Sequence, residues 1–303
     1  MTDIVDPTID IFIYDLRNGL GNTLDEIEQN KANFRKKFSE YVSQESLIDE
    51  DKWNYDAEYL QMLKHKPVEI DLHDHYKGYF YPVLLGDAYG LLIDCAVKNK
   101  VDAQPAEYFA GIKTEIERIL KGQVGTIGQT WMLSGWLPLL DKNKSHEEIA
   151  QVCYKSFRSE STWEEDLDGQ GQFLGASIFE LTFEPTKDTH WHVIIIISPD
   201  EETLNLYGKF VSDWMLLFYY RHKIFGAYSN SRKLNISLQN YFTKIKSGSD
   251  SFEKVRNKDS ELNTLNQMLV NLQNRLDEYR RDLTILDFQG STIDINLSNY
   301  GIR

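Results

Sequence analysis

Four of the seven histidines occur as two close pairs and are the residues best suited to hold a metal ion. His73 and His75 stand in "DLHDH", and His190 and His192 stand in "HWH". If both stretches are strands, alternation places the members of each pair on one face, and neighbouring strands could bring the pairs together around Zn²⁺ or Fe²⁺. The alternative is that both pairs are ordinary polar residues at strand ends. The sequence favours this alternative, because no third ligand motif such as HExxH accompanies the pairs.

Two further segments resemble ligand-binding loops only in part. The acidic "EEDLDGQGQ" (164–172) lacks the ligand spacing of a calcium-binding EF-hand loop, so a solvated acidic turn is expected. The glycines of "GTIGQT" (125–130) are not followed by the lysine of a P-loop, and no GxSxG nucleophile motif is present. These patterns predict a protein that is not an enzyme and needs no cofactor. A metal-dependent enzyme that uses the paired histidines is the alternative.

A basic and aromatic stretch departs from the acidic average of the chain. Between Asp213 and Asp250 there is no acidic residue, and the interval contains six lysines and arginines. Basic side chains interleaved with aromatic rings can bind nucleic acid, acidic lipid headgroups or an acidic protein. The alternative is that the rings form a packing stripe and that the later cations suit the C-terminal end of a helix. The candidate binding residues are Arg221, His222, Lys223, Arg232 and Lys233.

Composition narrows the class of protein. The 303 residues carry a formal net charge of −14, which disfavours nucleic acid and anionic membranes as partners. A hydrophobic fraction of 41% with 13% aromatic residues is typical of a folded core. The N-terminus has no secretory signal pattern, and no apolar run approaches the ~20 residues of a membrane helix. Cys95 and Cys153 stand apart from any CxxC motif, so two buried free thiols in a cytoplasmic, reducing compartment are expected.

The first 198 residues contain both strand and helix patterns. "TIDIFIYDL" (8–16) alternates like a strand, and Thr23 with Glu26 forms a capping box that opens a helix. The pattern assigns no element to the glycine-rich segment 125–137. Further strands are expected within 67–97 and in the antiparallel pair 173–185 and 191–198, and further helices at 105–122 and 145–157. This order predicts an α+β domain, 1–198, with a mixed or antiparallel sheet and flanking helices.

The remaining residues, 199–303, have the pattern of a long helical hairpin. Ser198 as the N-cap, Pro199 at the first helical position and Glu201 closing the box predict where the first arm begins. The only clear break is "SGSDS" (247–251), so the two arms are expected at 199–246 and 252–300. The residues expected to anchor the hairpin to the sheet are Trp214, Phe218, Ile224 and Phe225.

The second arm contains a heptad seam. Its leucines recur at alternating steps of three and four residues, which is the spacing of a coiled coil. The seam can pack on the first arm within one chain, or it can join two or more copies. We favour packing inside the hairpin, with self-association as the alternative. The seam residues are Leu262, Leu265, Leu269, Leu272, Leu276, Leu283 and Leu286.

An N-terminal α/β part followed by a long helix with a distal leucine seam resembles the cytosolic half of CorA-type divalent-cation channels, in outline over residues 1–303. The resemblance implies a domain that senses a divalent ion through carboxylates. A CorA-type chain continues into two membrane helices with a Gly-Met-Asn signature, and this sequence contains neither. Membrane contact and conduction are therefore expected only if the chain continues beyond residue 303.

A second resemblance involves two shorter segments. "GYFYPVLLGDAYGLLIDC" (78–95) and "YYRHKIFGAYSNSR" (219–232) resemble uncharacterised bacterial, especially cyanobacterial, proteins associated with caspase-like and tetratricopeptide-repeat conflict systems. This resemblance implies an accessory part in defence or programmed cell death, with protein partners and no transferred catalytic residue. We therefore expect a non-enzymatic interaction protein whose sheet domain docks or senses. Its hairpin would mediate association, with a helical partner or in a homo-oligomer.

Overall fold

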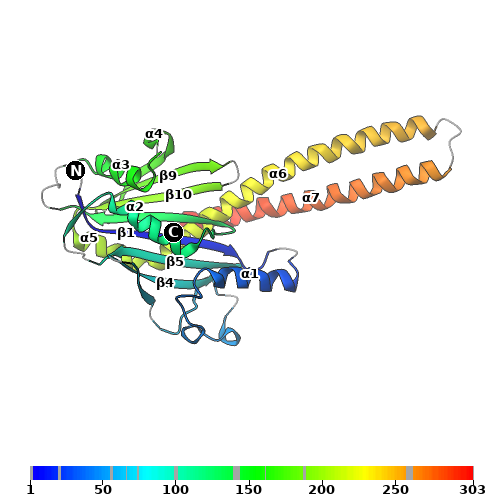
Figure 1. The fold of residues 1–303 in the computed structure, drawn as a ribbon. Coiled ribbons are helices and arrows are strands. Elements are labelled where there is room, and N and C mark those ends of the chain that lie inside the picture. The colour runs from blue at the N-terminus through cyan, green and yellow to red at the C-terminus, as the bar shows by residue number, and fades with distance from the viewer. Residues whose placement is uncertain are drawn as a thin grey trace. The chain divides into compact units, whose positions relative to one another are not determined.

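The computed structural model describes the chain as two compact units, Met1–Tyr219 and Tyr220–Arg303 (Figure 1). The first unit contains the sheet, and the second contains most of two long helices. The described residues are 3–19, 22–54, 57–65, 67–73, 75–98, 102–138, 144–160, 162–186, 189–256 and 262–302.

One mixed sheet of ten strands organises the first unit (Figure 1). The strands are β1 (Asp3–Leu16), β2 (Leu60–Gln61), β3 (Val68–Asp71), β4 (Tyr76–Leu85), β5 (Ala88–Val97), β6 (Ala103–Pro105), β7 (Gly128–Trp136), β8 (Leu167–Phe173), β9 (Ala176–Thr186) and β10 (Thr189–Ser198). Their order is β2-β4-β5-β1-β7-β10-β9-β8, with β3 also paired to β4 and β6 to β1. Among the described strands, β7 and β10 form the only parallel pair. The sheet and its flanking helices confirm the predicted α+β class.

The core of the first unit forms where helices cover the isoleucine face of β1. Ile9, Ile11 and Ile13 are fully buried in one cluster with apolar residues of three helices. Phe12 and Tyr14, on the opposite face of β1, are buried as well. The strand is therefore covered on both faces, as expected for a central strand. The helices are α1 (Leu24–Lys36), α2 (Tyr108–Leu120) and α3 (His146–Phe157).

The capping box predicted at the start of α1 is confirmed. The backbone N–H of Glu26 donates to Thr23 Oγ1 at 3.3 Å, and the backbone N–H of Thr23 donates to Glu26 Oε2 at 2.7 Å. Two groups that the first helical turn leaves unpaired are thereby satisfied. Hydrogen bonds to the exposed Glu26 carboxylate, from the Thr23 backbone first and then from the side chains of Thr23 and Asn22, lower the pKa of this carboxyl.

Strand β7 is the element that the sequence pattern does not reveal. It lies between β1 and β10, in the middle of the sheet. Glycine disfavours strands, and here it hides the alternation of the segment. The backbone at Gly135 needs this small residue, because an added Cβ would lie 2.6 Å from Ile4 Cδ1. The close approach of β7 to its neighbour therefore explains a composition that otherwise suggests a loop.

The expectation of a solvated acidic turn at 164–172 is wrong. The segment forms a short helix, α4 (Trp163–Asp166), followed by strand β8. Asp166 is buried, accepts a hydrogen bond from Tyr154 Oη at 2.8 Å and forms an ion pair with Arg158. A buried carboxylate is tolerated only with such partners. The acidic run is thus partly structural, which its composition alone does not indicate.

A buried ion pair joins three segments at one end of β1. Lys37 Nζ lies 2.8 Å from Asp15 Oδ2, with side chains that are 4% and 2% exposed. The backbone N–H of Thr126 donates to the other oxygen of the same carboxylate at 2.9 Å. Lys37 follows the end of α1, and Thr126 precedes β7. Burying two charges is costly, so neither can lose its partner without a large loss of stability.

The predicted N-cap of the next helix is wrong by two residues. Ser198 ends β10, and Asp200 is the N-cap of α5 (Glu201–Tyr207), accepting a hydrogen bond from the Thr203 N–H at 2.8 Å. The parallel pairing of β10 with β7 extends to Ser198, which keeps this residue in the strand. A 3₁₀ turn at Gly208–Phe210 then leads into α6 (Val211–Arg256).

The first residues of α6 belong to the sheet unit. Tyr14 Oη donates to the carbonyl of Met215 at 2.9 Å, and Phe12 packs edge-to-face on Phe218 with ring centroids 5.1 Å apart. Burial raises the pKa of the Tyr14 phenol, which keeps it protonated as a donor. The boundary between the units therefore lies after Tyr219, within α6, and not at the end of the last strand.

The second unit is a pair of antiparallel helices, the later part of α6 and α7 (Leu262–Ile302) (Figure 1). The predicted break at 247–251 is wrong, because α6 continues through it to Arg256. Ser251 Oγ donates to the carbonyl of Ser247 at 2.8 Å, which occupies a hydroxyl that could otherwise compete with the helix. Gly248 admits Leu272 from the opposite helix, since an added Cβ would lie 2.9 Å from Leu272 Cδ2.

We expect Lys37→Met to lower the free energy of unfolding by about 3–5 kcal/mol, because it leaves the Asp15 carboxylate buried without its cation. Urea unfolding followed by circular dichroism measures the change. Lys36→Met, the same substitution at the exposed neighbouring position, should cost less than about 0.5 kcal/mol. A loss below about 1 kcal/mol for Lys37→Met would contradict the structural role of the pair.

Both cysteines are free and buried, as expected from their surroundings. Burial raises the pKa of the Cys153 thiol to about 12 and raises that of Cys95 still further. Reactivity requires the thiolate, which at pH 8 is scarce for such groups. We predict negligible reaction of the folded protein with a thiol reagent at pH 8 and reaction of two thiols per chain in concentrated urea. Rapid labelling of a thiol in the folded protein would show that its burial is incomplete.

Candidate functional site

The structure does not bring the four histidines together. His73 and His75 lie exposed in the turn between β3 and β4, whereas His192 lies in β10. Three strands separate β4 from β10, a distance of roughly 19 Å at the usual strand spacing of ~4.8 Å. The side chain of His190 is outside the described residues. Among the residues that the structure describes, no group of three or more histidine, cysteine or acidic side chains could hold a metal ion.

His192 instead belongs to a buried polar cluster. Its Nδ1 lies 2.8 Å from Thr130 Oγ1, and its Nε2 lies 3.1 Å from Glu180 Oε1. This order of hydroxyl, imidazole and carboxylate is also that of a catalytic triad. Thr130 and His192 are 0% and 1% exposed, however, and the Phe218 ring packs on the imidazole at 5.5 Å. A substrate could not reach the hydroxyl, so this geometry favours a structural role.

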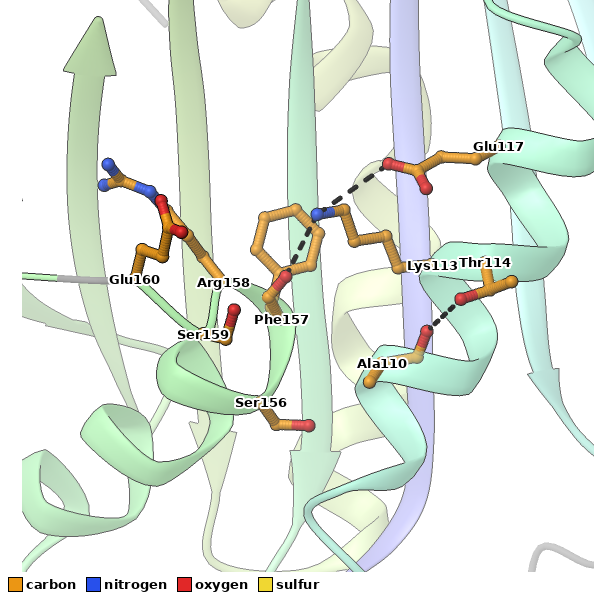
Figure 2. Close-up of a pocket in the computed structure, with 9 residues that line it drawn as sticks. All are labelled: Ala110, Lys113, Thr114, Glu117, Ser156, Phe157, Arg158, Ser159 and Glu160. Carbon is orange, nitrogen blue, oxygen red and sulfur yellow. Dashed lines mark hydrogen bonds and ion pairs between the residues drawn. The ribbon is translucent and has the colours of Figure 1, made fainter. Parts of the chain in front are cut away.

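A hollow of about 360 Å³ lies on the first unit between α2 and the end of α3 (Figure 2). Lys113 crosses it, donating to the carbonyl of Phe157 at 3.1 Å and lying 3.7 Å from Glu117 Oε1. Its ammonium also lies 4.7 Å from the centre of the Phe157 ring. Lys113 thus satisfies a backbone carbonyl at the C-terminal end of α3, where the helix dipole favours a cation.

The second cation of this hollow is also engaged. Arg158 forms an ion pair with Asp166, and its guanidinium lies 3.9 Å from the centre of the Phe183 ring. Ser156 Oγ is buried without a hydrogen-bond partner among the described residues. The lining includes no histidine or cysteine, and its carboxylates belong to Glu117, which lies near Lys113, and to Glu160. The hollow therefore combines cations that contact the end of α3 with the hydroxyls of Thr114, Ser156 and Ser159.

The predicted basic residues divide into two groups on α6. Arg221 and His222 are buried, and the Arg221 guanidinium lies 4.5 Å from the centre of the Phe225 ring. Arg232 and Lys233 are exposed, but adjacent helical residues point about 100° apart. Lys223 is half-buried. The five residues consequently do not form one continuous cationic surface.

The leucine seam of α7 is shared between the hairpin and solvent. Leu265, Leu272, Leu276 and Leu286 are partly buried, whereas Leu262, Leu269 and Leu283 are 73%, 50% and 42% exposed. The hairpin thus uses mainly one of the two rows that make up a heptad seam. The other row repeats every seven residues from Leu262 to Leu283, and three of its four leucines face outward, whereas Leu276 is partly buried.

The two helices keep one register over two turns. Ser237 Oγ donates to Asp282 Oδ2 at 3.2 Å, and Arg275 donates from a guanidinium nitrogen to the carbonyl of Lys244 at 3.2 Å. Each contact lies seven residues from the other on both helices. Such heptad matching is what keeps antiparallel helices in contact along their length.

A groove with polar and apolar lining residues lies between the helices where the outward row passes α6. It has a volume of about 560 Å³, and its apolar lining consists of Leu238, Phe242, Tyr279, Leu283 and Leu286. Phe242, at 61% exposed, is the largest outward apolar side chain of this lining. Phe242 was not selected from the sequence as a binding residue, because the expected packing stripe of α6 passes through its neighbour Tyr241. A phenylalanine beside a packing stripe is nevertheless a signal of an exposed apolar contact. Exposed apolar surface of this kind is typical of a binding surface. We call Phe242, Leu269 and Leu283 the association face.

No protein-family model matches this chain, and no curated protein or solved structure is significantly similar to it. The resemblances to CorA-type channels and to bacterial conflict proteins therefore stay predictions. No helix in the described part of the chain is long and apolar enough to cross a membrane. Inference about function thus depends on the geometry of the chain itself, in which the association face is the best-defined candidate site.

Proposed function

We propose that this chain is a non-enzymatic association protein whose helical hairpin binds a second copy of itself through the association face. The observation that carries the proposal is the exposure of Leu262, Leu269 and Leu283, three of the seven leucines of the heptad seam. A hairpin that adds a second hairpin becomes a four-helix bundle, in which both rows of each seam are covered. The antiparallel register of α6 and α7 supplies a straight surface on which a copy can pack.

The apolar area is sufficient for moderate affinity. Burying a leucine or phenylalanine contributes about 1.5–3 kcal/mol, and Leu269, Leu283 and Phe242 are already partly covered. Six such side chains, three from each copy, therefore supply roughly 10 kcal/mol. Loss of translational and rotational freedom opposes this with about 4–15 kcal/mol. Association should accordingly be reversible, and a single buried charge should abolish it.

The sheet unit would act as the docking or sensing part that the hairpin brings together. It has its own core, and Lys113 in the hollow and His192 both make structural contacts. Two buried free thiols suit a reducing, cytoplasmic compartment. The resemblance to bacterial conflict proteins would make such an assembly an accessory in defence or cell-death signalling.

We expect Leu269→Asp combined with Leu283→Asp to convert the associated protein into single chains. Both side chains are exposed in the hairpin, so the change should spare its fold while placing carboxylates in the interface. Light scattering after size exclusion should give about twice 35.3 kDa for the wild type and 35.3 kDa for the variant.

The matched control is Asn266→Asp with Asn274→Asp, which adds the same charge at exposed positions of the same helix. This control should keep the wild-type mass, and circular dichroism should show equal helix content in all three proteins. A single-chain mass for the wild type at its highest soluble concentration would refute self-association through the hairpin.

A further inference from the structure

We propose that in the associated form α6 of each copy lies against α7 of the other, with Arg232 facing Asp287 of the partner subunit. This inference rests on the proposed function, because it concerns the geometry of the same association face. Its basis is the unequal charge of the two helices and the register in which they lie.

Charge differs sharply between the two helices. From residue 214 to residue 249, α6 has six basic residues and no acidic one, whereas α7 has three arginines against five acidic residues. Two α6 helices in contact would place like charges together, which opposes association. Contact between α6 and α7 instead pairs a basic helix with a mildly acidic one, and flanking charges of this kind select partners in helical bundles.

The register of the hairpin places one opposite-charge pair at the same level. Ser237 contacts Asp282. Arg232 lies five residues before Ser237, and Asp287 lies five residues after Asp282, so antiparallel helices bring both to one height. Both side chains are exposed, and no ion pair of either one occurs among the described residues.

Helix spacing places both residues close to the groove, although neither of them lines it. Arg232 lies on the α6 face that carries Asn235 and Gln239, which line the groove, because residues three and seven apart share a helix face. Asp287 is four residues after Leu283, which places it beside the outward leucine row. At this height the α6 flank of the association face is therefore basic and the α7 flank is acidic.

Symmetry decides which charges meet. A two-fold axis that runs along the groove, parallel to the helices, places α6 across from α7 of the other copy and preserves height. Arg232 then faces Asp287 of the partner subunit, and the same pair forms a second time. A two-fold axis across the helices would place α6 on α6, so the charges favour the first arrangement.

Charge reversal tests this arrangement in a way that separates contacts between chains from contacts within one. Arg232→Asp gives a chain with two acidic residues at these positions, and Asp287→Arg gives a chain with two basic ones. Each variant alone should dissociate about tenfold more readily at low salt, because both of its intermolecular pairs become repulsive. An equimolar mixture should recover wild-type affinity, since both pairs in the mixed dimer are then attractive.

Dissociation constants come from light scattering over a dilution series, at low and at high salt. Lys244→Asp, the matched control, makes the same charge change on an exposed face of α6 turned away from Arg232, and it should leave the constant unchanged. If the wild type associates while both reversals and their mixture behave like it, the inference is overturned and the proposed function stands. If the wild type is a single chain, the proposed function fails first and the inference falls with it.

Discussion

The packing of α7 on α6 determines which leucines of the seam are covered, and it covers the two rows unequally. Leu265, Leu272 and Leu286 are partly buried, whereas in the other row Leu262, Leu269 and Leu283 are exposed and Leu276 is partly buried. The contacts of Ser237 with Asp282 and of Lys244 with Arg275 hold the two helices in this register. An outward leucine row is therefore a consequence of how the hairpin packs, and its best-supported explanation is a further helix.

The sheet unit uses its polar residues differently. Asp15, Asp166 and His192 are buried and each contacts a partner from another element. Such contacts are expensive to break and restrict which strands and helices can pack together. These aspartate and histidine side chains could serve in catalysis or metal binding as judged from the sequence, but in the folded chain they make structural contacts. This favours a structural role for these three residues.

Sequence patterns predicted the elements whose signals are local. The β1 alternation, the capping box of α1 and the antiparallel pair β9 and β10 follow from neighbouring residues. Strand β7 and the continuous helix through 247–251 depend on distant packing, because Gly135 and Gly248 each admit a side chain from another element. The burial of Asp166 likewise depends on Tyr154 in α3 and on Arg158, which follows α3. The seam was visible in the sequence, but which of its rows faces outward required the helix register.

The distribution of charge explains why copies would meet through the hairpin. The first unit has 38 acidic residues against 20 basic ones, whereas residues 220–303 have nine acidic against thirteen basic. Two sheet units approaching each other would repel strongly, since like net charge opposes association. The hairpin is nearly balanced, and within it the basic α6 and the mildly acidic α7 offer complementary flanks. Apolar surface and electrostatics therefore both favour contact through the hairpin over contact between two sheet units.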